Sequence, residues 1–405
     1  MIFCEFECLF ENWGSYDTLL RPVGDRKKVE KCMEIFHMLL AWYDENRRDL
    51  PWRGEKDPYR IWVSEIMLQQ TRVETVRRYY DRFLQLFPAP AALAGATEES
   101  VLKAWEGLGY YSRARKLQDG ARQITTEYGG RLPGTYDELI RIRGIGPYTA
   151  GAIASIAFGE RQPAVDGNAL RVFSRLFGLK ENMGSEAGKR RVREIMAEEM
   201  HERYGDCNQA VMDLGSLICL PRNPSCESCP LQGKCVAWRD GLTDSLPVLP
   251  VRKKQQSVSY ALLIMIKDDM KEPGMKEPGL VGHRAVLVQK RKEKLLQGLW
   301  VFPMLEGQFS EEAVGREVRN IYGIHPHDIS YRGQARHVFT HLIWEMDLWV
   351  IRFSGDFHAG KGIHLASRGD LERLAMPTAV RRAREVAGEL LSDQILGDSL
   401  PEISK

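Results

Sequence analysis

Two carboxylates stand in segments that could support acid–base chemistry. Glu65 lies in the run from Trp62 to Thr71, and Asp166 lies in a short turn before an expected helix over residues 169–177. Cleaving an N-glycosidic bond requires an acid that protonates the leaving base and a negative group near the developing oxocarbenium ion. Two carboxylates in different environments can divide these tasks. A buried Glu65 would hold its proton more tightly and suit the acid, whereas Asp166 would stay ionised.

Both carboxylates also have structural interpretations. Asp166 or its neighbour Asn168 can cap the N-terminus of the helix that follows. Glu65 can be a glutamate in the first turn of a helix, where the helix dipole favours a negative charge. The two residues by themselves leave both interpretations open.

Four of the eight cysteines are clustered in a way that suits a metal centre. Cys219, Cys226, Cys229 and Cys235 have the spacing C-x6-C-x2-C-x5-C, which places four thiolates on one compact loop for a soft metal. Zinc sites with four cysteines usually come as two close pairs. Only one pair is close here, so an iron–sulfur cluster is slightly favoured over zinc. An expected helix over residues 206–218 would deliver Cys219 to the loop.

The segment from Leu139 to Ala150 predicts two helices joined by a tight glycine turn. Gly144 and Gly146 form the turn, and Pro147 suits the first position of the second helix. The free amides at that helix start would face outward, where a phosphate can bind without sequence preference. An ordinary joint between two helices is the alternative for this short motif on its own.

The net charge of +2 gives no general argument for nucleic acid, so that case must rest on local basic patches. The sequence offers three such patches: Arg113, Arg115 and Lys116; Arg141 and Arg143; and Arg252, Lys253 and Lys254. Taken alone, each patch is more readily interpreted as solvated surface.

The N-terminal segment carries Glu5, Glu7, Glu11 and Asp17 and lacks the basic start and apolar run of a secretory signal. A cytoplasmic, reducing location is therefore expected, in which the cysteines do not form disulfides. No apolar run is long enough to predict a membrane span.

The 405 residues suffice for two domains. The helical period of three or four recurs up to about Trp238, as at Val29, Met33, Phe36, Leu40 and Tyr43, and at Val73, Val76, Tyr80, Phe83 and Phe87. Thr135 and Glu138 predict a capping box that opens a helix at Tyr136.

From residue 257 the apolar period changes to two. Strands are expected over residues 257–267, 285–290 and 342–350, and helices over 310–322 and 377–391, which indicates a mixed α+β domain. We therefore expect a multidomain chain in this order: an extension of no assigned role over 1–24, an all-α domain over 25–240, a Pro-containing basic linker over 241–256, and the α+β domain over 257–400. A duplicated pentapeptide over residues 270–279 is interpreted as a loop insertion.

In their order along the chain, these motifs resemble the helix–hairpin–helix DNA glycosylases that carry an iron–sulfur loop. Within that superfamily the chain resembles the MutY-type adenine DNA glycosylases, on the segments 50–53, 57–59, 64–71 and 144–149. The family removes adenine mispaired with 8-oxoguanine or guanine in base excision repair. The resemblance implies a monomer that binds double-stranded DNA and holds a 4Fe–4S cluster on the four cysteines.

The resemblance also implies roles for single residues. Glu65 would protonate N7 of a flipped adenine, and Asp166 would stabilise the oxocarbenium ion or attack the sugar as a nucleophile. Tyr148 and Asn168 would line the site around them. Extracting a stacked base requires a wedge and a pocket, and the DNA contacts would come from Leu68 and Gln70, which fill the gap, from Thr71, from the wedge Tyr110, and from the hairpin glycines Gly144 and Gly146.

Tyr148 stands where relatives with lyase activity, such as endonuclease III, have a lysine that forms a Schiff base. A phenol cannot do so, and we expect a monofunctional glycosylase with no or very weak lyase activity. The main alternatives are a bifunctional glycosylase/lyase and a non-catalytic, zinc-stabilised DNA-binding protein, which would leave Glu65 and Asp166 without a task.

The second domain resembles the Nudix fold through the segments Gly298–Pro303 and Arg316–Val318. Asn320 and Ile321 stand where that family has two acidic metal ligands, so no pyrophosphatase activity is expected. Phe339, Thr340 and His341 match the family loop, usually Phe-Ser-His, that recognises 8-oxoguanine, and threonine keeps the hydroxyl. A Nudix hydrolase fused to a helical module is the third alternative.

Overall fold

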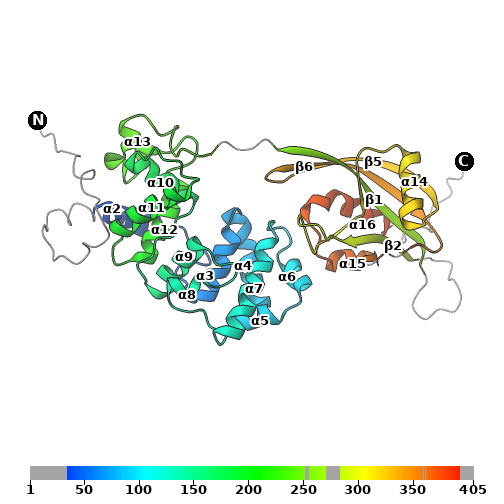
Figure 1. Ribbon diagram of the computed structural model, residues 1–405, viewed down its shortest axis with the longest axis horizontal. Coiled ribbons are helices and arrows are strands. Elements are labelled where there is room, and N and C mark those ends of the chain that lie inside the picture. Colours follow the sequence, from blue (N-terminus) through cyan, green and yellow to red (C-terminus); the bar gives the residue numbers. More distant parts are fainter. Residues whose placement is uncertain (1–33, 251–254, 271–282, 359, 361, 393–405) are drawn as a thin grey trace, which may run out of the picture.

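The computed structural model describes residues 34–250, 255–270, 283–358, 360 and 362–392. These form a helical unit followed by a unit built on a β-sheet, and the two units lie side by side (Figure 1). The extension over residues 1–24, the basic run 252–254 and most of the duplicated pentapeptide lie outside the described residues. The structure confirms the expected fold class, an all-α unit followed by an α+β unit.

The helical unit contains short helices with brief connections. In chain order they are α2 (Glu34–Asn46), α3 (Pro58–Leu68), α4 (Val73–Leu86), α5 (Pro90–Gly95), α6 (Glu98–Ala104), α7 (Ser112–Glu127), α8 (Tyr136–Leu139), α9 (Pro147–Phe158), α10 (Gly167–Phe177), α11 (Glu186–Glu199), α12 (Tyr204–Leu217), the 3-10 helices η2 (Cys226–Ser228) and η3 (Gln232–Lys234), and α13 (Val236–Arg239).

The apolar periodicity predicts the buried helix faces correctly. In α4 the side chains of Val76, Tyr80 and Phe83 are buried, and in α2 those of Phe36, Leu40 and Tyr43 are buried. Val29 and Met33 precede the described residues. Two apolar clusters form the core: one joins α3, α4, α7 and α9, and the other joins α2, α10, α11 and α12.

Three local expectations were wrong. Glu65 lies in the last turn of α3 and not in a first turn, because Asp57 caps the helix and Pro58 begins it. Helix α8 begins at Tyr136 as predicted, but the hydroxyl of Thr135 bonds the carboxylate of Glu138 at 2.6 Å and caps no backbone amide, so the capping box does not form. Arg113 does not belong to a basic patch on the surface, since the residue is buried and only 9% of it is exposed.

The second unit is a sheet with helices on both faces. Its strands are β1 (Gln256–Met270), β2 (His283–Lys290), β3 (Trp300–Val301), β4 (Met304–Glu306), β5 (Pro326–Val338), β6 (Leu342–Phe353) and β7 (Ile363–Ala366). The order is β3-β2-β1-β6-β5, with β4 against β1 and β7 against β2. The pair β1–β6 is parallel and the other pairs are antiparallel.

Helix α14 (Glu311–Tyr322) packs on one face of this sheet. The other face carries α15 (Arg368–Arg373), η4 (Thr378–Val380) and α16 (Arg381–Leu390). In β6, Trp344 and Met346 face one apolar cluster and Ile351 and Phe353 face the other. The strand is therefore buried on both sides, which explains why its apolar residues do not alternate cleanly with polar ones.

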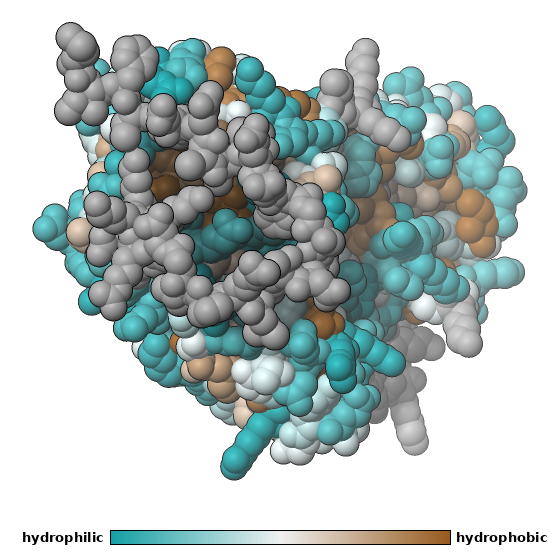
Figure 2. Space-filling view, turned by 60° about the vertical axis from the view of Figure 1, so that its left-hand side comes forward, coloured by the Kyte–Doolittle hydropathy of each residue, from teal (hydrophilic) through white to brown (hydrophobic). Residues whose placement is uncertain are grey.

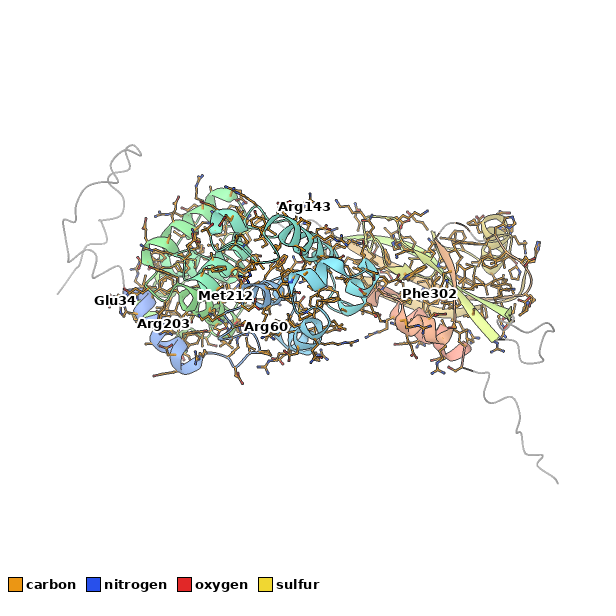
Figure 3. All side chains as sticks on the ribbon, turned by 90° about the horizontal axis from the view of Figure 1, so that it is seen from below. Glu34, Arg60, Arg143, Arg203, Met212 and Phe302 are labelled. Carbon is orange, nitrogen blue, oxygen red and sulfur yellow. The ribbon has the colours of Figure 1, made fainter. Side chains whose placement is uncertain are left out.

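Seen from below, Met212 lies in the helical unit and the buried Phe302 lies in the sheet unit (Figure 3). Most of the described surface in view in Figure 2 is hydrophilic, with small hydrophobic areas between. Among the helices that the structure describes, none combines the length and the hydropathy needed to cross a membrane.

Candidate active site

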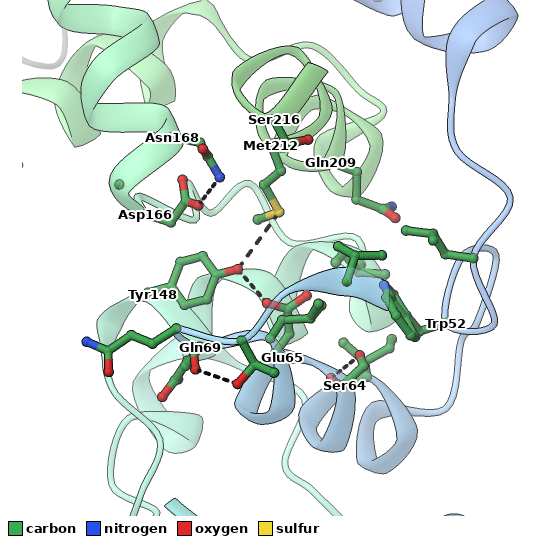
Figure 4. Close-up of a pocket in the computed structure, with 18 of the residues that line it drawn as sticks. Trp52, Ser64, Glu65, Gln69, Tyr148, Asp166, Asn168, Gln209, Met212 and Ser216 are labelled. Atoms are coloured by element: carbon green, nitrogen blue, oxygen red, sulfur yellow. Dashed lines mark hydrogen bonds between the residues drawn. The ribbon is translucent and has the colours of Figure 1, made fainter. Parts of the chain in front are cut away.

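A cavity of about 690 Å³ opens where α3, α9, α10 and α12 meet. It brings together predicted residues from distant parts of the sequence: Glu65, Leu68, Gln70, Thr71, Tyr110, Tyr148, Asp166 and Asn168. Gly144, Gly146 and the loop 339–341 do not line it. Figure 4 shows Tyr148 between Glu65 on one side and the pair Asp166 and Asn168 on the other.

Glu65 is only 6% exposed and receives a hydrogen bond of 2.5 Å from the phenol of Tyr148. Burial raises the pKa of Glu65, and the negative charge of Asp166 adds to this, whereas the Tyr148 hydrogen bond and the charge of Arg53 oppose it. Burial also raises the pKa of Tyr148, which therefore stays protonated and remains a donor. The side chain of Glu65 is thus a carboxyl with increased proton affinity on the wall of a cavity.

Asp166 is the N-cap of α10 and also faces the cavity. Its carboxylate accepts the backbone N–H of Ala169 at 2.8 Å and the side-chain amide of Asn168 at 2.7 Å. Arg171 in turn donates to Oδ1 of Asn168 at 2.8 Å, which fixes the orientation of that amide. Burial raises the pKa of Asp166 too, contrary to a simple contrast with Glu65, but these donors stabilise its charged form.

A buried network supports the wall opposite Tyr148. Asp213 is fully buried, and its Oδ1 accepts hydrogen bonds from Arg48 Nε at 3.0 Å and from Arg53 Nη2 at 2.7 Å. Arg53 also donates to the amide oxygen of Gln209. Because this oxygen is engaged, the NH2 group of Gln209 is the part left to face a ligand in the cavity.

Sequence reasoning assigned no role to several side chains that line the cavity: Arg48, Trp52, Arg53, Ser64, Gln69, Gln209, Met212 and Ser216. A signal for four of them was present, since Trp52 and Arg53 belong to the segment 50–53, and Ser64 and Gln69 to the segment 64–71, that carried the family resemblance. No local pattern marks Gln209 or Met212, which sit on the otherwise ordinary helix α12.

Gln70 and Tyr110 flank the cavity mouth, and both have left-handed backbone, with φ of +56° and +46°. Left-handed backbone is uncommon for residues other than glycine and is often associated with function. Tyr110 is 47% exposed. These two residues therefore stand on tight turns at the edge of the site.

Arg113 holds both turns. Its guanidinium donates to the carbonyls of Ile66, Met67 and Gln69 on one side, at 2.7, 3.0 and 2.5 Å. On the other side it donates to the carbonyls of Leu108 and Gly109, at 3.0 and 3.1 Å. The hydroxyl of Thr71 accepts a sixth hydrogen bond at 3.0 Å. Arg113 is thus a structural anchor and not a phosphate contact.

The glycine turn and the second helix of the hairpin are as expected, but the first helix, α8, already ends at Leu139, and turns lead from there to Gly144. Gly144 has φ +84°, and a Cβ there would lie 2.8 Å from the carbonyl oxygen of Lys116, so the turn requires glycine. Pro147 begins α9, and the N-cap Gly146 makes no side-chain cap. A Cβ on Gly146 would meet no atom within 4 Å, which leaves the helix start open for a ligand.

The four cysteines surround one small cavity after α12, together with Arg175 and Trp238. The guanidinium of Arg175 lies 3.4 Å from Sγ of Cys219. Within the described residues, no three His, Cys, Asp or Glu side chains form a group that would hold a single metal ion. Four soft donors beside a buried cation nevertheless suit an anionic cluster of several metal ions.

The loop over 339–341 joins β5 and β6 and does not itself line the cavity. Thr340 is exposed, and its Oγ1 shares a hydrogen bond of 2.9 Å with the hydroxyl of Tyr110 in the helical unit. The Phe339 ring packs edge-on against the buried Trp344, with centroids 5.0 Å apart. On α14, the apolar side chain of Ile321 is 49% exposed.

Comparisons with known proteins agree with this architecture. Residues 63–198 match the model of the HhH-GPD superfamily of base excision DNA repair proteins, and residues 279–385 match the NUDIX domain. The adenine DNA glycosylase of Rattus norvegicus is 32% identical over 412 residues, which cover 90% of this chain and 80% of the relative. The adenine DNA glycosylase of Schizosaccharomyces pombe is 30% identical over 415 residues, which cover 86% of this chain and 87% of the relative.

Among solved structures, a thermostable thymine-DNA glycosylase is 29% identical, with a TM-score of 0.49, and covers 53% of this chain and 99% of its own. The extended matches to curated relatives include both units of the chain. The chain belongs to the adenine DNA glycosylase family of base excision repair enzymes.

Proposed function

We propose that this adenine DNA glycosylase removes adenine paired with 8-oxoguanine or guanine and leaves an abasic site without cutting the strand. The observation that carries this proposal is the placement of Glu65, Tyr148 and Asp166 around one cavity, with the phenol donating to Oε2 of Glu65. A base extruded from the duplex would occupy this cavity.

Glu65 is proposed as the general acid. It would donate its proton to N7 of adenine, which then accepts the electron pair of the breaking bond between C1′ and N9 and leaves as neutral adenine. The raised pKa of Glu65 supports this assignment because a larger fraction of the carboxyl is protonated near neutral pH.

Asp166 is proposed to stabilise the sugar cation, either by charge alone or as a nucleophile that forms a transient bond to C1′. Asn168 would orient this carboxylate, because its amide donates to Oδ2 at 2.7 Å. Water then adds at C1′, displaces the carboxylate of Asp166 where a bond to it had formed, and gives its proton to the carboxylate of Glu65, which completes the hydrolysis and restores the acid. Tyr148 offers no amine for a Schiff base, which supports a monofunctional reaction.

We infer that the four cysteines hold a 4Fe–4S cluster, which would act as a structural brace for a loop with little apolar core. Their common cavity and the neighbouring Arg175 support this inference. Metal and sulfide analysis of protein prepared without oxygen tests it. Iron with acid-labile sulfide is expected, and stoichiometric zinc without iron would instead favour the zinc-stabilised alternative.

We further infer that residues 25–240 act as the glycosylase domain and 257–400 as the recognition domain, joined by the linker 241–256, and that the protein works as a monomer. Thr340 would contact 8-oxoguanine through its hydroxyl. Thr340→Ala is expected to lower the preference for 8-oxoguanine over guanine, whereas Thr126→Ala, an exposed threonine on α7, should leave it unchanged.

The test of the whole proposal is a single-turnover assay on duplexes that contain adenine opposite 8-oxoguanine or guanine. Each reaction is analysed with and without alkali. Strand breaks only after alkali would support adenine removal without lyase chemistry. Breaks without alkali, together with a borohydride-trapped covalent product, would refute the monofunctional mechanism. Magnesium-dependent release of pyrophosphate from nucleotides would favour the Nudix hydrolase alternative instead.

A further inference from the structure

The Nudix-like segment Gly298–Pro303 performs no task in the proposed reaction, yet one of its residues packs against the core of the helical unit. Leu299 is fully buried and belongs to the apolar cluster formed by α3, α4, α7 and α9. Ala375, which follows α15, joins the same cluster. The sheet unit therefore adds two buried apolar side chains to the main apolar cluster of the helical unit.

The residue after Leu299 makes a polar contact across the same boundary. The indole N–H of Trp300 donates to Oε1 of Glu99 on α6 at 2.6 Å. The ammonium of Lys290 lies 3.8 Å from the other oxygen of Glu99 and 5.4 Å from the centre of the Trp300 ring. A single glutamate is thus bound by a donor and a cation of the second unit.

Two further contacts join the sheet unit to α6 and to Glu106, which follows it. Lys103 donates to the carbonyl of Leu374 at 3.0 Å, and Arg384 donates to Oε1 of Glu106 at 2.6 Å. We use the name α6 clasp for four features together: the Lys103–Leu374 contact, the Arg384–Glu106 contact, the Glu99–Trp300 hydrogen bond and the buried side chain of Leu299. Figure 1 shows α6 on the side of the helical unit that faces the sheet unit.

The segment held by the clasp continues directly into the site. Gly107 and Gly109, with φ of +102° and +70°, turn the chain from α6 to Tyr110. Tyr110 has left-handed backbone and meets Thr340 of the sheet unit through the shared hydrogen bond of 2.9 Å. The clasp and the Tyr110–Thr340 contact are therefore linked by one short stretch of chain, residues 105–110.

We propose that the residual Gly298-Leu299-Trp300 motif has become a docking element, and that the α6 clasp sets the specificity of the enzyme by fixing the recognition loop relative to Tyr110. Glu99 and Leu299 act here as positioning residues, since neither lines the cavity. This inference rests on the proposed function, because it assumes that the loop at Thr340 recognises the base opposite adenine.

The physical argument concerns two groups that must act on one base pair. Thr340 and Tyr110 are 230 residues apart in sequence, so only packing between the units can hold them at hydrogen-bond distance. A linker alone would leave the recognition loop at a low effective concentration near the mismatch. The clasp restricts the motion of the two units before DNA binds. It therefore reduces the conformational entropy that is lost when the recognition loop is ordered on the DNA.

The experiment compares full-length wild-type protein with Glu99→Ala and Leu299→Ala. Asp119→Ala is the matched control, since Asp119 forms an ion pair of 3.2 Å with Arg122 on α7, away from the clasp. Single-turnover rates are measured for adenine opposite 8-oxoguanine and opposite guanine. Hydrogen exchange of residues 98–104 is measured on the same proteins without DNA.

We expect both clasp variants to reduce the ratio of the two rates about tenfold while the rate opposite guanine changes less than twofold. Hydrogen exchange of residues 98–104 should rise in both clasp variants. When either substitution is added to Thr340→Ala, the ratio of the two rates should fall no further than in Thr340→Ala alone. An unchanged ratio, or an equal loss on both duplexes, overturns the specificity role. If Leu299→Ala fails to fold, Glu99→Ala alone decides.

The exchange measurement separates this inference from the proposed function. If the wild-type enzyme had equal rates opposite 8-oxoguanine and opposite guanine, recognition by the second unit would be refuted, regardless of the results for the clasp variants. Unchanged exchange in both clasp variants would refute docking through α6, even for an enzyme that discriminates well between the two duplexes.

Discussion

The phenol of Tyr148 donates to Oε2 of Glu65 at 2.5 Å, and Asp166 acts on both side chains through its charge. Three groups from three helices or helix starts are thereby coupled around one cavity. Their protonation states depend on one another, so substitutions at one group should be visible in the titration of another.

Glu65→Gln should abolish most base release while leaving duplex affinity nearly intact. The amide oxygen can still accept the Tyr148 hydrogen bond, but the side chain has no acidic proton to give. General acid catalysis contributes about 100- to 10,000-fold, and a loss of this size is expected. Single-turnover kinetics and a binding titration with the same duplex measure the two effects. Poor binding by the variant would indicate a structural role for Glu65.

The same variant should be more stable than the wild type at neutral and higher pH. The folded-state pKa of Glu65 lies above its ordinary value of 4.5, so the folded protein binds this proton more tightly than the unfolded chain. The wild type therefore gains stability as pH falls from the folded pKa toward 4.5, and the variant does not. The difference in melting temperature should shrink with falling pH, and a constant difference would contradict a raised pKa.

Tyr148→Phe should move the alkaline limb of the rate profile to higher pH. The lost hydrogen bond had stabilised the charged carboxylate and lowered the pKa of Glu65, so its removal raises that pKa further. A general acid is active while protonated, and activity should therefore persist to higher pH. Tyr80→Phe removes a hydroxyl that bonds the carbonyl of Arg60 outside the cavity, and it serves as the control. A limb that moved to lower pH would refute this electrostatic assignment.

Asp213→Asn should destabilise the helical unit strongly. Asp213 is fully buried, and its removal leaves the guanidinium groups of Arg48 and Arg53 without a compensating charge. Breaking a buried ion pair on one side costs about 3–5 kcal/mol. Thermal or urea unfolding measures this, with Asp119→Asn on the surface as the control, for which a change below about 1 kcal/mol is expected. Equal stability of the two variants would show that the network contributes little.

The two hairpin glycines allow folding to be separated from DNA binding. Gly144→Ala should destabilise the protein, because alanine is strained at φ +84° and its Cβ meets the carbonyl of Lys116. Gly146→Ala should fold normally, since its Cβ meets open space, but it should weaken DNA binding if a phosphate lies against this helix start. Wild-type affinity in a folded Gly146→Ala variant would exclude phosphate binding at that position.

The sequence predicts the fold class and eight residues of the cavity wall, because short motifs fix the local geometry of each. Pro147 and the hairpin glycines, for example, determine where α9 begins. The network of Asp213 with Arg48 and Arg53 was not predictable, since its members lie 165 and 160 residues apart and no local pattern pairs them. Arg113 was misjudged for a related reason: an arginine beside other basic residues resembles surface until the carbonyls that it binds are known.

Arg113 has a consequence for how the enzyme can change. Five of its six hydrogen bonds go to main-chain oxygens, so its hold on the turns at Gln70 and Tyr110 depends little on which side chains those positions carry. Other side chains can therefore occupy those two positions while the backbone that presents them stays in place. One buried cation thus uncouples the choice of side chains at the edge of the cavity from the maintenance of the turns that carry them.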